Sequence, residues 1–273
     1  MTIYELIEQG ALQPFAGGVI DASMDVSKPF VVLNPKRLRV EVQTAEPVSL
    51  AVVYTESCQA SVEVLLAPHA KLSVTELYLA KSLAVVEVSQ QEQSEFKQLT
   101  ALLCGANVSY KLCLQGAHCQ SELDAAFVVS GSEHAALSVE TRHEVADCRS
   151  RSMVKGVAAG RSTGEFRGLV YVAPDAQRTD AEQQNRNIEL DDARIVATPQ
   201  LEIYADDVRC SHGSTVGYSD AEAIFYMRQR GISEADARRL QIEGFVRDVV
   251  SRCQTSPVCA LLDEQVVEKL SKL

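Results

Sequence analysis

The chain has 273 residues, of which 46% are hydrophobic and 5% aromatic, with no tryptophan, and its formal net charge is −11. A chain this acidic lacks the clustered Lys and Arg that bind nucleic acids or anionic membrane surfaces, so neither is an expected partner. No apolar run approaches the roughly 20 residues that span a bilayer and the first ten residues are unlike a signal peptide, so we expect a cytoplasmic protein whose eight cysteines are thiols.

The first predicted element is a short amphipathic helix over residues 2–9 that ends at Gly10. From residue 30 onward, short Val- and Leu-rich segments alternate between apolar and polar residues and are separated by turn residues, which is typical of strands. The predicted strands are 30–33, 38–42, 48–54, 61–66, 71–79, 83–88, 107–114, 121–129, 135–141, 165–172 and 187–190. Residues 90–103 fit a helix or a long loop equally well.

A recurring unit links these strands, namely a small or polar corner followed by an alternating strand. The corners Gly105, Gly131, Gly160 and Asp191 are separated by 26, 29 and 31 residues. Such an array favours a solenoid in which each coil buries its apolar side chains against the next. A parallel β-helix fits this pattern and so does an irregular β-sandwich, because periodicity alone does not separate them.

The C-terminal stretch is predicted to be helical. Ser219, with Glu222 three residues later, forms a capping box for the first of three amphipathic helices. Ser233 caps the second helix, and Ser256 followed by Pro257 opens the third. Three short helices suit a small domain that caps the end of the solenoid, and their spare apolar surface is a candidate for binding a partner.

The segment before these helices begins as a strand and becomes a polar turn that contains Cys210, Ser211, His212 and Gly213. On an extended strand Cys210 and His212 would share a face, and a thiolate with an imidazole suits zinc, iron or a persulfide. A zinc site normally has four ligands, so the spacing alone favours a buried thiol and a hydrogen-bonded turn histidine.

Other candidate groups have simpler interpretations. Cys113 alternates with apolar residues near the pair His118 and Cys119, and it is expected to be buried as a small hydrophobic residue. We expect His134 and His143 to be solvated. Five isolated cysteines are assigned to packing: Cys58, Cys104, Cys148, Cys253 and Cys259.

One alternative function is that of a polysaccharide-acting enzyme, because some β-helix enzymes use carboxylate pairs such as Asp206 and Asp207. The absence of tryptophan argues against it, because such enzymes line their grooves with aromatic platforms.

The string LEIYADDVRCSHGSTVG, followed by FYMRQRGIS and EADARRL, resembles the C-terminal signature of the SufD branch of the SufB/SufD family. These proteins are scaffold subunits of the SUF iron–sulfur cluster assembly machinery. The resemblance extends back through AQRTDAEQQNRNIEL to about Gly160. It implies a non-catalytic, mainly β protein with a right-handed parallel β-helix and a small C-terminal α-helical domain. The predicted division is an N-terminal segment 1–29, a β-helix core 30–217 and a helical domain 218–273.

The resemblance also implies partners and a site. The partners are a SufB-like paralogue and a SufC-like ATPase, with a homodimer when the chain is alone. An iron–sulfur cluster would form transiently at the interface with SufB, with none held tightly by the isolated chain. His212 would be the metal ligand or proton-handling residue, with Cys210 beside it, while Tyr226, Arg228 and Phe245 would dock the ATPase. A SufB-like scaffold is an alternative that the C-S-H-G sequence argues against, and a self-associating β-helix without metal chemistry is another.

Overall fold

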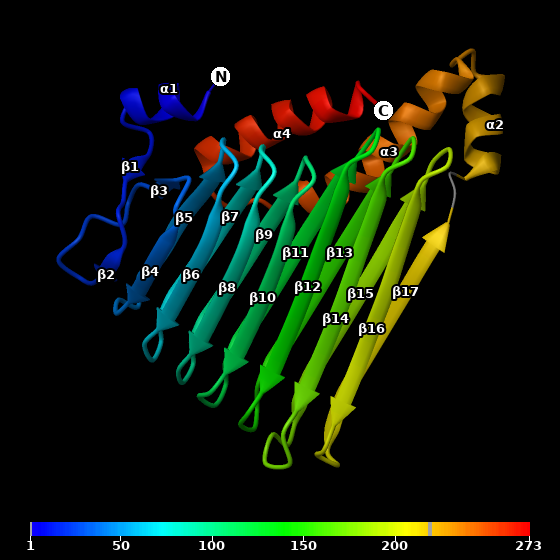
Figure 1. The fold of residues 1–273 in the computed structure, drawn as a ribbon. Coiled ribbons are helices and arrows are strands. Elements are labelled where there is room, and N and C mark those ends of the chain that lie inside the picture. The colour runs from blue at the N-terminus through cyan, green and yellow to red at the C-terminus, as the bar shows by residue number, and fades with distance from the viewer. Residues whose placement is uncertain (1, 218–219) are drawn as a thin grey trace.

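Successive strands of the chain alternate between two parallel sheets that face each other, in a computed structural model that describes residues 2–217 and 220–273 (Figure 1). The nine-stranded sheet contains, in this order, β1 (Gln13–Pro14), β3 (Phe30–Leu33), β5 (Pro47–Tyr54), β7 (Lys71–Tyr78), β9 (Glu95–Leu102), β11 (Gln120–Val129), β13 (Arg149–Ala158), β15 (Thr179–Glu189) and β17 (Val208–Gly217). The eight-stranded sheet contains β2 (Gly18–Ile20), β4 (Arg37–Val42), β6 (Gln59–Leu66), β8 (Leu83–Gln90), β10 (Asn107–Leu114), β12 (His134–His143), β14 (Thr163–Val172) and β16 (Arg194–Ile203). The prediction of a mainly β, solenoid-like fold is confirmed.

Side-chain alternation builds the interior between the sheets. On β6, Val62, Val64 and Leu66 are buried, whereas Glu63 between them is exposed. Parallel pairing stacks equivalent positions on successive coils, so each coil covers the apolar face of the one before it. The period-2 pattern of the sequence therefore sets both the register and the core.

Three of the four predicted corners form one stacked column. Gly131, Gly160 and Asp191 have φ values of 64°, 70° and 58°, and the N–H of Gly160 donates to Oδ2 of Asp191 at 3.1 Å. This left-handed conformation favours glycine, and aspartate tolerates it better than most residues. Gly105 is not in this column, because it lies against the backbone of His134.

Two stretches are strands where the sequence predicted otherwise. Residues 90–103, read as helix or loop, contain the end of β8 and all of β9. The polar run that holds Cys210 and His212, read as a turn, is β17. In addition, β1, β2 and β13 were not predicted.

The helices are α1 (Ile3–Glu8), α2 (Ala221–Gln229), α3 (Glu234–Val250) and α4 (Ser256–Leu270). The predicted cap of α3 at Ser233 is confirmed. Helix α1 lies within the predicted range 2–9, and Thr2 is its N-cap rather than its first helical residue. Ser219 lies outside the described residues, and α2 begins after Asp220, whose side chain accepts from two backbone N–H groups. The prediction for α4 was wrong by one residue, because Thr255 is its N-cap and Ser256 is already helical.

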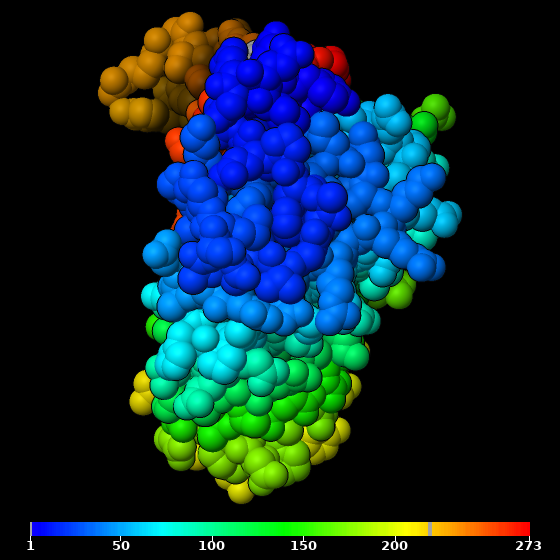
Figure 2. Space-filling model, turned by 90° about the vertical axis from the view of Figure 1, so that its left-hand side faces the viewer, coloured from blue at the N-terminus to red at the C-terminus, as the bar shows by residue number. Residues whose placement is uncertain are grey.

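Helices α3 and α4 lie along the outer face of the nine-stranded sheet instead of capping the end of the solenoid (Figure 1). Val246 and Leu262 of these helices share an apolar core with outward-facing Val53, Leu77 and Val128 of the sheet. Residues near the N-terminus cover the first coils, while α2 and the start of α3 project from the body (Figure 2). Among the described residues, no helix is long and apolar enough to cross a membrane.

Candidate functional site

The last coil is the open end of the solenoid. Strand β17 pairs only with β15, and β16 only with β14, among the described strands. Each therefore presents one edge of backbone N–H and C=O groups that no further strand of the described chain covers. Both candidate residues of the Cys-Ser-His-Gly sequence lie on β17 at this end.

Cys210 lies opposite Ala181 of the preceding coil and is half-buried beside Leu201 and Val208. Burial raises the pKa of its thiol, so at neutral pH the group is a thiol rather than a thiolate. In this state the cysteine packs as a small apolar residue, and a metal would have to displace its proton.

His212 follows on the same face of the strand, opposite Gln183. Gln183 is only 1% exposed because the last coil covers it, whereas His212 has no further coil above it and is exposed. The imidazole thus stands on the inward-facing side of an uncovered coil. Exposure was predicted correctly, but it arises from the end of the solenoid and not from a turn.

The two donors share a face, as the spacing predicted. No group of three or more His, Cys, Asp or Glu side chains within residues 2–217 and 220–273 is placed to hold a metal ion. A metal or cluster at this coil would need donors from outside the described chain.

Exposed apolar side chains surround this end of the molecule, and sequence reasoning missed them. Val196 on β16 is 43% exposed and Val216 on β17 is 44% exposed, and Ile203 and Tyr204 at the end of β16 are also exposed. For Ile203 and Val216 a signal was present, since both continue the inward-facing positions of their strands, opposite buried Val172 and Asn187. Val196 lies on the outer face of β16, opposite Glu165.

The three residues assigned to partner docking lie on different surfaces. Tyr226 on α2 is 60% exposed and its hydroxyl accepts from Arg230 at 2.7 Å. Arg228 forms an ion pair with Glu234 at 3.1 Å, which joins α2 to α3. Phe245 does not extend this surface.

Phe245 instead faces the sheet from α3. It is half-buried, with the ammonium group of Lys155 from β13 at 4.5 Å from its ring centroid. The exposed aromatic neighbour of Tyr226 is Phe225, which is 62% exposed and was not singled out from the sequence.

His143 is buried, contrary to the prediction that it is solvated. It is fully inaccessible between the sheets, with Nε2 2.8 Å from the hydroxyl of Ser150. Burial lowers the pKa of its imidazole to about 4, so the ring is neutral at physiological pH. His134 is exposed, as expected, and its Nδ1 lies 2.8 Å from the hydroxyl of Thr163.

Cys113, His118 and Cys119 have different surroundings. His118 is exposed at a corner, Cys113 is half-buried, and Cys119 is buried with its sulfur 2.9 Å from the carbonyl oxygen of Gln91. The partner of Cys119 is Cys148, and a hydrogen bond between them holds the pKa of Cys119 at about 6. Nothing links this buried pair to the last coil.

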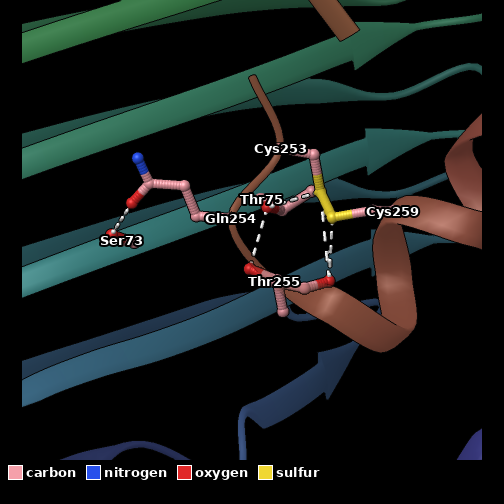
Figure 3. The surroundings of a disulfide bond; sticks show 6 residues. All are labelled: Ser73, Thr75, Cys253, Gln254, Thr255 and Cys259. Atoms are coloured by element: carbon pink, nitrogen blue, oxygen red, sulfur yellow. Dashed lines mark hydrogen bonds between the residues drawn. A yellow bond between two sulfur atoms is a disulfide. The ribbon is translucent and has the colours of Figure 1, made fainter. Parts of the chain in front are cut away.

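Two cysteines are not thiols. Cys253 in the turn after α3 and Cys259 in the first turn of α4, predicted to be isolated packing residues, form a disulfide (Figure 3). The prediction that all eight cysteines are thiols was therefore wrong.

The sequence matches a known protein family and several of its members. A family model described as "SUF system FeS cluster assembly, SufBD core domain" matches residues 32–245, which include the last coil and α2. The chain is 43% identical over 108 residues to the iron-sulfur cluster assembly protein SufD of Escherichia coli, which covers 39% of this chain and 26% of that protein.

Two other relatives match longer stretches. A SufBD family iron-sulfur cluster assembly protein of Synechocystis is 29% identical over 209 residues, or 68% of this chain and 45% of that protein. A SufBD family protein of Mycobacterium leprae is 31% identical over 167 residues, or 57% of this chain and 43% of that protein. The chain thus spans less than half the length of these curated relatives.

Proposed function

Because this chain belongs to the SufBD core family of the SUF iron–sulfur cluster assembly system, we propose that it is a non-catalytic, SufD-like scaffold subunit that works in the cytoplasm. The observation that carries the proposal is the uncovered last coil, which combines two open sheet edges, exposed apolar residues and an exposed imidazole. A related solenoid can continue both sheets at this end by strand addition.

The partner at the last coil is a SufB-like paralogue. Val196 and Val216 provide apolar area on the two terminal strands, and the open edges provide directional hydrogen bonds. A second copy of the chain offers the same edges, so we infer that a homodimer forms when the paralogue is absent.

The cargo of this interface is a nascent iron–sulfur cluster. His212 is the residue that ligates the metal or transfers a proton, since a neutral imidazole can do either near neutral pH. Cys210 is two residues away on the same face of β17. A cluster ordinarily takes about four protein ligands, so the paralogue must supply the others and the isolated chain holds no cluster tightly.

The second partner is a SufC-like ATPase, which we place on the exposed side of α2. Phe225 and Tyr226 are the large side chains available there, and Arg228 fixes the helix to α3. Movement of the ATPase would be transmitted through α3 to the sheet, because α3 packs on β11 and β13.

The double variant Val196→Lys/Val216→Lys tests the pairing surface. Buried ammonium groups without partners are costly, so we expect Kd for the paralogue to rise at least about 100-fold. The measurement is co-purification followed by titration of the isolated subunits.

Val85→Lys is the matched control, because Val85 is 44% exposed on β8, away from the last coil. The Val85→Lys variant should bind the paralogue with the same affinity as the unmodified chain and should have the same melting temperature. If the double variant and the control both bind the paralogue as tightly as the unmodified chain does, the paralogue does not pair with the last coil.

Replacing His212 by alanine should lower cluster assembly while leaving fold and complex intact. An exposed strand residue contributes under about 1 kcal/mol to the free energy of unfolding, so the melting temperature should hardly change. The readout is maturation of iron–sulfur enzymes in cells that depend on this system.

His134→Ala is the comparison, since His134 is an exposed strand histidine on a remote coil. It should support normal maturation. If the His212→Ala variant assembles, melts and supports maturation normally, His212 has no functional role.

A further inference from the structure

The disulfide between Cys253 and Cys259 closes the turn that joins α3 to α4 (Figure 3). Its Cα atoms are 5.6 Å apart, which lies within the ordinary range for a disulfide. Both cysteines are partly exposed, whereas the thiols of Cys119 and Cys148 are buried. A partly exposed disulfide is accessible to small thiols, which attack one of its sulfur atoms.

The bonded turn is fixed to the outer face of β7. Gln254 accepts from the hydroxyl of Ser73 at 3.0 Å, and the hydroxyls of Thr255 and Thr75 lie 2.9 Å apart (Figure 3). The hydroxyl of Thr75 is also 3.7 Å from the sulfur of Cys253. The disulfide therefore sits between the first turn of α4 and the strand that anchors it.

A second contact extends this attachment toward the middle of the sheet. Arg252 forms an ion pair with Asp124 of β11 at 2.8 Å. Next to it is a cavity of about 260 Å³, whose lining includes Lys97, Arg151, Arg252 and Gln254. Small polar molecules thus have room beside the turn that carries the two sulfur atoms, in a cavity whose lining also includes the carboxylates of Glu122 and Asp124.

We propose that Cys253 and Cys259 are a reversible redox site that locks the α3–α4 turn onto β7 when oxidised. The oxidant is a hydroperoxide such as hydrogen peroxide, and the reductant is a low-molecular-weight thiol such as glutathione. This inference rests on the chemistry of the turn and does not depend on the proposed scaffold function.

Oxidation of the two thiols by hydrogen peroxide takes two steps. One cysteine thiolate attacks a peroxide oxygen and becomes a sulfenic acid, while the O–O bond breaks and the leaving hydroxide takes a proton to form water. The second thiol then attacks the sulfenic sulfur, forms the S–S bond and releases a second water. In the reverse direction two glutathione molecules reduce the disulfide to two thiols and leave as glutathione disulfide.

Reduction should loosen the turn without detaching α4. The apolar contacts of Val258, Leu261 and Leu262 with the sheet do not involve the sulfurs, so the helix stays docked. The covalent loop that restrains residues 253–259 is lost. We therefore expect local backbone opening near the turn to increase while the rest of the solenoid is unchanged.

The test uses the full-length, folded chain in a series of glutathione redox buffers. Quenched samples are alkylated and digested, and the 253–259 peptides are measured by mass spectrometry. We expect reversible conversion of this pair without denaturant, re-formation of the bond after hydrogen peroxide is added to the reduced chain, and amide exchange in the turn at least about 10-fold faster after reduction. Cys113→Ser, which removes a half-buried thiol elsewhere, should change none of these results.

Three outcomes overturn the proposal. Reduction that requires denaturant would make the bond purely structural. A reduced, folded chain that peroxide does not re-oxidise at this pair would exclude a reversible site, and unchanged amide exchange would exclude the locking of the turn. Cys253→Ser and Cys259→Ser each serve as references for the permanently open turn, and either one that folds suffices.

Discussion

Replacing Glu76 by alanine is expected to destabilise the protein by about 3–5 kcal/mol, even though the residue lies far from the last coil. Glu76 on β7 is 2% exposed and faces the interior between the two sheets. Its Oε1 accepts from the hydroxyls of Tyr54 at 3.1 Å and Tyr78 at 2.9 Å. Its Oε2 accepts from Gln98 at 3.1 Å and from the hydroxyl of Tyr110.

The cost arises from the donors that remain. In the alanine variant the hydroxyl groups of Tyr54 and Tyr78 would stay buried without their acceptor, and the amide of Gln98 would lose one of its acceptors, in addition to the cavity left behind. For a chain of this size, the loss corresponds to a fall in melting temperature on the order of 10 °C.

The protonation state of Glu76 gives this prediction a second measurable consequence. Burial raises the pKa of the carboxyl, and the hydrogen bonds from Tyr110, Tyr78, Tyr54 and Gln98 only partly oppose this. The folded chain then keeps a proton that the unfolded chain has released, so this contribution to stability is present at low pH and is lost as pH rises through the folded pKa. Glu76→Gln should remove that pH dependence.

Thermal unfolding of three variants distinguishes the causes. Glu76→Gln keeps an acceptor for the tyrosines and should cost less than Glu76→Ala, while Glu87→Ala, at an exposed position on β8, should cost under about 0.5 kcal/mol. If the Glu76→Ala variant has the same melting temperature as the Glu87→Ala control, the buried hydrogen bonds to Glu76 do not stabilise the fold.

The polar residues around Glu76 explain why β9 could not be predicted from the sequence although most other strands could. Most strands place Val or Leu at every second position, and their existence followed from that pattern. On β9 the inward positions include Gln98 and Thr100, which bond to each other, and Gln98 also donates to Glu76. Polar residues at core positions hide the alternation, so residues 90–103 looked like helix or loop.

The last coil was misread for a related reason. Its inward positions on β17 include Cys210, His212 and Ser214, which need not be apolar because no further coil of the described chain covers them. The residues themselves were singled out correctly as a candidate site by their donor chemistry. Their strand conformation depends on pairing with β15, a contact between distant segments that local sequence does not encode.

The sequence contains a signal for the position of α3 and α4. Strands β5, β7, β9, β11 and β13 end in runs that are buried on both faces, such as Ala51–Tyr54 on β5. Parallel strands with both faces apolar are covered on both faces, which indicates helices along the outer side of this sheet. The disulfide had no comparable signal, since a spacing of six residues does not identify a pair.

This placement of the helices decides how the ATPase surface must be tested. Deleting residues 219–273 would remove α3 and α4 from the sheet and expose apolar residues such as Val53, Leu77 and Val128 to water. Loss of ATPase binding in such a truncated chain would then report unfolding or aggregation. Substitutions on the exposed side of α2 avoid this difficulty.

The double variant Phe225→Asp/Tyr226→Asp is expected to weaken ATPase binding at least about 100-fold. Exposed aromatic residues at the centre of an interface commonly contribute about 2 kcal/mol or more each, and a buried carboxylate adds a desolvation cost. The fold should be unaffected, because both side chains are at least 60% exposed and the packing contact of this helix is made by buried Ile224.

The matched control is Tyr4→Asp on α1, where the tyrosine is 52% exposed at the opposite end of the solenoid. Binding is measured by titrating the purified ATPase subunit into each variant, with the melting temperature as the check on folding. The control should bind as the unmodified chain does, because α1 is remote from α2 (Figure 1). If the double variant is folded and still binds with unmodified affinity, the ATPase contacts another surface, and the coupling from α2 through α3 to the sheet must be abandoned with it.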